Sequence, residues 1–208
     1  MLKDVNCRFC SIVSGEYTFP IVDAPLADSE FFVATASIGS FIEGWTLIIP
    51  KEHCLSMSSY YAKTELFDFV NNFIPTIMKT YGSLIAFEHG SNCECSLTSC
   101  GTSHAHLHLV PFAGTLYPEL QKSNLEWVRC RASEIEEIRN NNEYLFYAEL
   151  NNNTKWQDPL GYVHLLKEPK SQFFRRLLAN YYGNPDIFDY KLFPFIDTAK
   201  KTYLKLSN

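Results

Sequence analysis

The sequence predicts an α+β fold in which one long helix packs on an antiparallel sheet. Three observations lead to this prediction. Short apolar runs of strand length occur on both sides of the segment 62–81. Within that segment, apolar residues recur every three or four positions, as they do on one face of a helix. The order of strands, one helix and then neighbouring strands favours an antiparallel sheet with helices on one side.

The predicted elements follow one another along the chain. Residues 29–36 and 45–50 have the character of strands, and Pro50 ends the second because proline has no amide hydrogen for a β-ladder. The helix at 62–81 is expected to stop at Gly82. Further along, we expect a loop at 91–103, a short helix at 171–183, and strands at 83–90, 104–110 and 143–150.

The patterns weaken after Pro111, which suggests a change in organisation. Residues 1–115 are expected to form the main domain. Residues 116–208 are expected to form a C-terminal α/β extension packed on it. No internal repeat is visible, and no linker cleanly separates the two parts.

Composition excludes several classes of function. The chain has 208 residues, of which 46% are hydrophobic, so it can bury a sizeable core. Its net charge is −5 and it has no long basic run, so binding of extended nucleic acid is not expected. No apolar segment approaches the ~18 residues of a membrane span, and no signal-like segment is visible, so we expect a cytoplasmic protein.

Seven cysteines are many for a cytoplasmic chain, where paired cysteines indicate metal or redox chemistry before disulfides. Cys7 and Cys10 have the CxxC spacing, and with His53 and His104 they could complete a tetrahedral Cys2His2 site. A second group could bind metal, form a labile disulfide or consist of free thiols; it comprises Cys93, Cys95 and Cys100.

The most informative stretch is HAHLHLVP, residues 104–111. Alternate residues of a strand point the same way, so His104, His106 and His108 should line one face. Three imidazoles on one face are costly to bury without partners. The alternatives are a structural role, metal binding, and a nucleophilic site with or without a metal beside it.

The histidine stretch resembles the signature of the histidine-triad superfamily of nucleotide hydrolases and transferases. Two further blocks, CRFCSIVSGE (7–16) and GWTLIIPKEH (44–53), are similar to other blocks of that family. The segment FEHG (87–90) resembles a subgroup that carries these letters. The resemblance covers about residues 5–112 and implies a histidine-triad fold.

The resemblance also implies a chemistry. The middle histidine, His106, would attack the α-phosphorus of a nucleotide anhydride, ester or phosphoramidate and form a covalent nucleotidyl-histidine. His108 would donate hydrogen bonds to the phosphate or the leaving group, and backbone N–H groups around 101–104 would hold other oxygens. The zinc-bearing members use the CxxC pair, the histidine of the second block and the first triad histidine, so a structural zinc is expected on Cys7, Cys10, His53 and His104. Pairing as a homodimer is implied as well, although the C-terminal extension could cover that surface.

The chain departs from the family pattern at several positions. Trp45 stands where many relatives have a further histidine, and it could be a core residue or stack on a base. The segment before the second block has Ser37 but no acidic residue for a ribose. The departures leave open a phosphorylase, a sugar-nucleotide transferase, or a non-catalytic zinc-stabilised nucleotide-binding module. The residues expected to contact the substrate are Ser103, Thr102, His89 and Arg175, with Arg176 as the alternative to Arg175.

Overall fold

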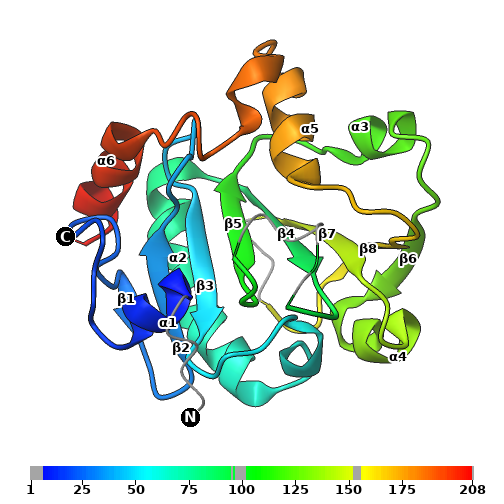
Figure 1. The fold of residues 1–208 in the computed structure, drawn as a ribbon, viewed down its shortest axis with the longest axis horizontal. Helices are drawn as coiled ribbons and strands as arrows, with labels where there is room; N and C mark the ends of the chain where they lie inside the picture. Colours follow the sequence, from blue (N-terminus) through cyan, green and yellow to red (C-terminus); the bar gives the residue numbers. More distant parts are fainter. Residues whose placement is uncertain (1–6, 95, 97–101, 152–155, 208) are drawn as a thin grey trace.

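A mixed sheet-and-helix architecture is visible in the computed structural model, which describes residues 7–94, 96, 102–151 and 156–207. Figure 1 shows the strands running through the middle of the molecule with helices around them. The elements, in chain order, are α1 (Arg8–Val13), β1 (Ala27–Asp28), β2 (Phe32–Ala36), β3 (Thr46–Pro50), α2 (Thr64–Tyr81), β4 (Leu84–Gly90), β5 (Leu107–Pro111), α3 (Tyr117–Lys122), β6 (Val128–Arg131), α4 (Ile135–Arg139), β7 (Tyr144–Leu150), β8 (Leu160–Leu165), α5 (Phe173–Tyr181) and α6 (Ile196–Leu206), with short 3-10 helices at Ser58–Tyr60, Ala132–Glu134 and Pro185–Phe188.

The strands form one eight-stranded sheet in the order β1-β2-β3-β5-β4-β7-β8-β6, and every neighbouring pair is antiparallel. β5 therefore lies near the centre, between β3 and β4. Its His108 stands opposite Leu47 on one side and Phe87 on the other. The strand that carries His108 is therefore paired with a neighbouring strand on each of its two edges.

Two hydrophobic cores lie on opposite faces of the sheet. The apolar face of α2 packs on one core through Leu66, Phe69, Val70, Phe73, Ile74 and Ile77. Alternate residues of a strand feed the two cores: Ile48 of β3 joins the α2 core, whereas Leu47 and Ile49 join the other. Helices α1 and α5 pack on that second core. In Figure 1, α1 lies in front of the strands and α2 behind them.

The expected α+β fold, with an antiparallel sheet and one long helix, is confirmed. The helix predicted at 62–81 is α2, and Gly82 follows it with a φ of 83° that suits glycine. The structure differs from the sequence prediction in the placement of the helices, because they cover both faces of the sheet and not one. Among the described residues, no helix is both long and apolar enough to cross a bilayer.

The C-terminal part of the chain extends the same sheet. β7 pairs with the whole of β4, from Leu84 opposite Leu150 to Gly90 opposite Tyr144, and β8 and β6 continue outward. The boundary expected near residue 115 thus falls between strands of one continuous sheet. The far edge of β4 is occupied by the chain's own β7, so this edge is covered within the chain.

The histidine strand is shorter than predicted. The ladder of β5 begins at Leu107, so His104 and His106 lie in the extended segment just before it. The alternation of faces is nevertheless as expected. Ala105, Leu107 and Leu109 are buried in the α2 core, and the histidines face the side of α1 and α5.

Candidate functional site

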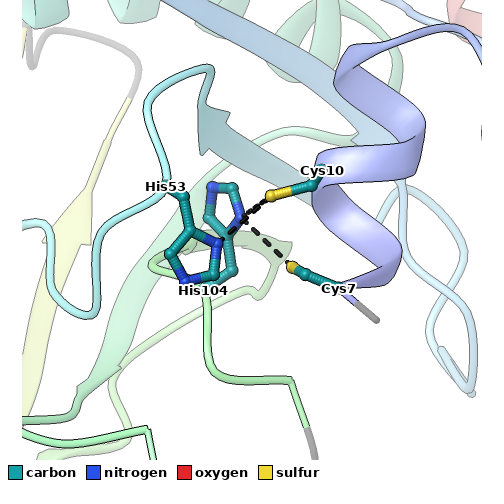
Figure 2. Close-up of side chains that lie close together, drawn as sticks. All are labelled: Cys7, Cys10, His53 and His104. Carbon is teal, nitrogen blue, oxygen red and sulfur yellow. Dashed lines mark hydrogen bonds between the residues drawn. The ribbon is translucent and has the colours of Figure 1, made fainter. Parts of the chain in front are cut away.

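A cluster of two thiols and two imidazoles joins α1 to the segment before β5. Each of Cys7, Cys10, His53 and His104 offers one ligand atom, and these atoms all lie within 4.8 Å of one another. Figure 2 shows the sulfur atoms of α1 pointing toward the two imidazole rings. The turn of helix between the cysteines aims both side chains the same way, and the prediction that these four residues meet agrees with this geometry.

The spacing of the donor atoms fits a tetrahedral ion. Cys7 Sγ lies 3.4 Å from His104 Nδ1, and Cys10 Sγ lies 3.2 Å from His53 Nδ1 and 3.6 Å from His104 Nδ1. A zinc ion with normal bond lengths to sulfur and nitrogen would set such pairs about 3.5 Å apart. The residues of this cluster could therefore hold a metal ion.

The outer nitrogens of both imidazoles have acceptors. His104 Nε2 lies 2.9 Å from the carbonyl oxygen of Pro50, and His53 Nε2 lies 2.9 Å from a carboxylate oxygen of Glu94. With a carbonyl oxygen and a carboxylate oxygen as acceptors, each Nε2–H donates and each Nδ1 lone pair faces the sulfur atoms. Acceptors of this kind orient metal-binding histidines in proteins. Burial raises the pKa of the Cys7 thiol to about 11, so a cation at the cluster is needed to favour the thiolate.

His106 is held in one tautomer by the backbone. Its Nδ1 lies 2.9 Å from the carbonyl oxygen of His104, which can only accept, so Nδ1 carries the proton. The lone pair of the neutral ring is therefore on Nε2. Phe9 of α1 packs edge-on against the ring at 5.0 Å. Burial lowers the pKa of His106 to about 4, and nearby Arg175 and Arg8 act in the same direction, so the ring is neutral at pH 7.

His108 is held by a neighbouring side chain and not by the backbone. Its Nδ1 accepts a hydrogen bond of 2.9 Å from the indole Nε1–H of Trp45. Its ring stacks on Phe87, the cross-strand neighbour, at 4.5 Å. Burial lowers the pKa of His108 well below its ordinary value, and His106 and Arg175 add to this effect.

A small cavity of about 50 Å³ lies in front of the last two triad histidines. This volume equals that of one or two water molecules, at ~30 Å³ each. Besides His106 and His108, the cavity is lined by Arg8, Phe9, Ser37, Ile38, Leu47, Thr102, Arg175 and Tyr190. Among the lining residues that the structure describes, the charged groups are cationic and none carries a carboxyl group, so the cavity suits an anion.

Arg175 is buried beside this cavity, with 5% of its surface exposed. Its guanidinium stacks over Trp45 at 4.7 Å, and its Nη2 donates to the carbonyl oxygen of Ile38 at 3.0 Å. Arg176 points elsewhere, over the ring of Phe188. Of the two arginines considered from the sequence, Arg175 is thus the one that the fold brings to the histidines.

The FEHG segment divides between the two faces of β4. Glu88 is fully buried on the α2 side, where it accepts hydrogen bonds from Tyr61, Tyr144 and the N–H of Met57. His89 shares the face of Phe87, on the side of the sheet where His106 and His108 lie. Burial lowers the pKa of His89 to about 3, and its buried Nε2 has no hydrogen-bond partner among the described residues. It does not line the cavity itself.

The two hydroxyl residues before the triad also separate. Thr102 lines the cavity, and its role as a substrate contact stays a prediction. Ser103 does not line the cavity, because its hydroxyl donates to the carbonyl oxygen of Glu94 at 2.8 Å and thereby holds the loop.

In the second cysteine group, Cys93 is partly buried. Cys95 and Cys100 lie outside the described residues, as does Gly101, where part of the expected phosphate-binding backbone would be.

Sequence reasoning missed several residues of the cavity wall, and two of them, Arg8 and Tyr190, carry polar groups. Arg8 lies between the CxxC cysteines, and it forms an ion pair with the fully buried carboxylate of Asp23. Tyr190 comes from the segment between α5 and α6, where no motif marks it. A basic residue inside the CxxC turn was the available signal for Arg8, since the turn had already been expected beside the triad.

The chain was compared with known proteins. No family model matches it, and no curated protein matches it significantly. Solved structures match about half of it. A zinc-bound histidine triad family protein from Mycobacterium smegmatis has 26% identity and a TM-score of 0.40, with 52% of this chain and 76% of that chain covered. A Hit-like protein from Bartonella henselae involved in cell-cycle regulation has 19% identity and a TM-score of 0.39, with 53% and 82% covered.

A HIT family hydrolase from Clostridium thermocellum also matches, with 22% identity and a TM-score of 0.37, covering 54% of this chain and 95% of that chain. The names of these proteins agree with the family that the sequence motifs resemble. The assignment to an FEHG-containing subgroup stays a prediction.

Proposed function

We propose that this chain is a histidine-triad enzyme, a nucleotide hydrolase or nucleotidyl transferase that works through a covalent nucleotidyl-histidine on His106. The observation that supports it best is the hydrogen bond from His106 Nδ1 to the carbonyl oxygen of His104. This bond leaves the Nε2 lone pair of a neutral imidazole beside a cationic cavity. Neutral imidazole is a good nucleophile, and a nucleotide α-phosphate is an anionic electrophile.

The reaction would take two steps. In the first, the lone pair of His106 Nε2 forms a bond to the α-phosphorus, and the bond from phosphorus to the leaving group breaks with its electron pair on the leaving group. In the second, water or another acceptor attacks the phosphorus, the phosphorus–nitrogen bond breaks, and its electron pair returns to Nε2. When water is the acceptor, one of its protons is released to solvent. His106 ends the cycle as it began.

The surrounding residues would bind and orient the phosphate. His108 and Thr102 line the cavity as hydrogen-bond donors, and Arg175 and Arg8 supply positive charge. Donors and charges fixed before the reaction lower the cost of charge that develops in the transition state. The cavity is smaller than a nucleotide, so substrate binding requires its lining to rearrange.

The Cys2His2 cluster would hold a structural zinc ion. All four positions of a tetrahedral ion would be filled by protein atoms, so the ion would stabilise the fold and would not bind substrate. His104 belongs to the cluster through its ring and to the nucleophile through its carbonyl oxygen. Zinc at the cluster would therefore hold α1 and the His106 backbone in place together.

Mass spectrometry of the intact protein tests the proposed function. The zinc-loaded protein is mixed briefly with diadenosine tetraphosphate or adenosine 5′-phosphoramidate and then quenched. We expect a mass gain of one adenylyl unit that maps to His106. The variant His106→Ala should show no mass gain and no turnover, with unchanged metal content and thermal stability. His164→Ala, which removes a histidine far along β8, should be labelled normally.

Other results would favour the alternatives. Labelling of His106 with slow hydrolysis but rapid release by phosphate or a sugar phosphate would indicate a phosphorylase or sugar-nucleotide transferase. Nucleotide binding with zinc present and no labelling by either compound would indicate a non-catalytic module. Full turnover in the His106→Ala variant would contradict the mechanism itself.

A further inference from the structure

Trp45 makes a contact with the triad that the sequence analysis did not predict. It is fully buried immediately before β3, and its indole N–H donates to His108 Nδ1 at 2.9 Å. An indole nitrogen can only donate, so Nδ1 of His108 must accept and cannot carry a proton while this bond exists. The proton of the neutral ring is then on Nε2, and no other described residue bonds that atom.

The indole cannot easily turn away from His108. Phe41 and Phe87 each meet the ring edge-on with centroids 5.7 Å apart, and the Arg175 guanidinium lies 4.7 Å from it on a face. A histidine in the place of Trp45 could donate or accept and could share a proton with His108. Tryptophan has no proton to share in this way, because the indole nitrogen does not titrate in water.

We propose that Trp45 is a positioning residue that keeps His108 as a neutral Nε2–H donor, and that the site therefore releases leaving groups that depart without gaining a proton. The favoured substrate class is the nucleotide anhydride, whose leaving group is a phosphate. This inference rests on the proposed function and narrows it. Burial and the nearby charge of Arg175 also oppose a second proton on His108, which supports the geometric argument.

The charges around the leaving group agree with this substrate class. A phosphate monoester has a second pKa of about 6, so it leaves as a stable anion near pH 7. An amine has a pKa of about 10 and must be protonated as it leaves a phosphoramidate. The described lining of the cavity has no carboxylic acid to supply that proton, and its arginines do not release theirs. It does have cationic groups to receive a phosphate.

The bond changes can be followed atom by atom. The lone pair of His106 Nε2 attacks the α-phosphorus, and the phosphorus–oxygen bond of the anhydride breaks. Its electron pair stays on the leaving phosphate oxygen, and no proton is transferred in this step. The N–H of His108 donates a hydrogen bond to a phosphate oxygen and keeps its proton.

The tautomer is tested by NMR on the zinc-loaded protein, with histidine labelled with nitrogen-15. Long-range proton–nitrogen spectra distinguish the protonated from the bare ring nitrogen. We expect His108 to carry its proton on Nε2, and His106 to carry its proton on Nδ1. In Trp45→Phe, which lacks the donor, His108 should show exchange between both tautomers. A wild-type His108 with its proton on Nδ1 would overturn the proposal.

The leaving-group preference is tested by kinetics with two probes that share the adenylyl group. We expect the wild type to have a kcat/KM for diadenosine tetraphosphate at least ~100-fold above that for adenosine 5′-phosphoramidate. Trp45→Phe should lower kcat/KM for the anhydride about tenfold to a hundredfold, as loss of orientation of a transition-state donor does. Trp45→His should recover part of this loss and should narrow the ratio between the two probes.

A matched control separates the hydrogen bond from the change in volume. Trp156 is also fully buried, but its Nε1 has no hydrogen-bond partner among the described residues and it lies in the α2 core. Trp156→Phe removes the same atoms and should change neither the His108 spectrum nor the ratio of the two probes. Equal kcat/KM for both probes in the wild type would overturn the leaving-group preference. Absence of turnover and of labelled His106 would overturn the proposed function as well, while the spectra would still decide the tautomer.

Discussion

Replacing Glu88 by glutamine should remove the contribution of this buried carboxyl group to the pH dependence of stability. Burial raises the pKa of this carboxyl group to about 7 from 4.5, against the lowering effect of its three hydrogen-bond donors. Because the pKa is raised in the folded state, the protonated form is the stable one. The contribution of this carboxyl group to the free energy of unfolding is therefore largest below pH 4.5 and falls as the pH rises toward 7. A shift of this size corresponds to about 3 kcal/mol, most of it lost between pH 5 and pH 8.

Urea denaturation at several pH values measures this effect. The difference in unfolding free energy between wild type and Glu88→Gln should change by about 2–3 kcal/mol from pH 5 to pH 8. The wild type loses this stability as the pH rises, and the variant does not. Comparing the two proteins cancels the titration of the metal ligands and of other groups. Exposed Glu137, replaced by glutamine, serves as the control and should change nothing. A difference that is the same at pH 5 and pH 8 would refute the burial of Glu88, and with it the assignment of His89 to the opposite face of β4.

Two further predictions concern the surroundings of the triad. Cys10→Ser should abolish metal binding and lower the melting temperature, and it should expose the bond after Arg8 to trypsin, because α1 is no longer fixed to the two histidines through a metal ion. Metal analysis and limited proteolysis check this. The control is Cys130→Ser, which changes a buried cysteine outside the cluster and should leave the metal content unchanged. Gly39→Ala should destabilise the protein and lower kcat/KM about tenfold, because a Cβ at φ 70° would clash with Tyr190 and Arg175 beside the cavity. Gly15→Ala, with φ 81° and open space around its Cβ, should show only the backbone cost of about 1 kcal/mol and normal kinetics.

Periodicity predicted the framework well because it reflects burial directly. The repeat in α2 places six apolar side chains in one core, and the alternation along 104–110 places Leu107 and Leu109 in that same core. The end of α2 was also predictable, since the left-handed conformation at Gly82 strongly favours glycine. Phe87 and His89 share a face of β4 because alternate residues of a strand point to the same side.

The C-terminal strands were harder to predict from sequence. β6 has the letters VRCR, and of its residues only Cys130 is buried, so it lacks the alternation of a half-buried strand. β8 is marked by a single fully buried valine, Val163, and by a glycine, Gly161, that allows the close approach of Tyr147. The structure of such strands depends on pairing with a neighbour: β7 pairs with β4, β8 pairs with β7, and β6 pairs with β8.

The tautomers of the triad could not be derived from the histidines alone. Each depends on a partner atom that only the fold identifies: a carbonyl oxygen two residues away for His106, and an indole 63 positions earlier in the chain for His108. A sequence pattern gives the side chains and their face, but a ring nitrogen becomes a nucleophile or a donor only through the group on the opposite nitrogen. Trp45 was predicted as a core residue or a base-stacking residue, and the hydrogen bond adds a third role to a core position.

His104 connects the two halves of the site through a single residue. Its ring lies in the cluster of thiols and imidazoles and its carbonyl oxygen accepts from His106 Nδ1, so a shift of the ring moves the atom that fixes the tautomer of His106. Phe9, between the two cysteines, contacts both histidine rings, at 5.8 Å and 5.0 Å, and resists the same shift. The spacing of two residues between His104 and His106 allows this arrangement. It keeps both rings on one face, and it lets the carbonyl oxygen of His104 reach Nδ1 of His106. The three histidines are therefore not equivalent: in the proposed mechanism the first holds the metal ion, the second attacks, and the third donates.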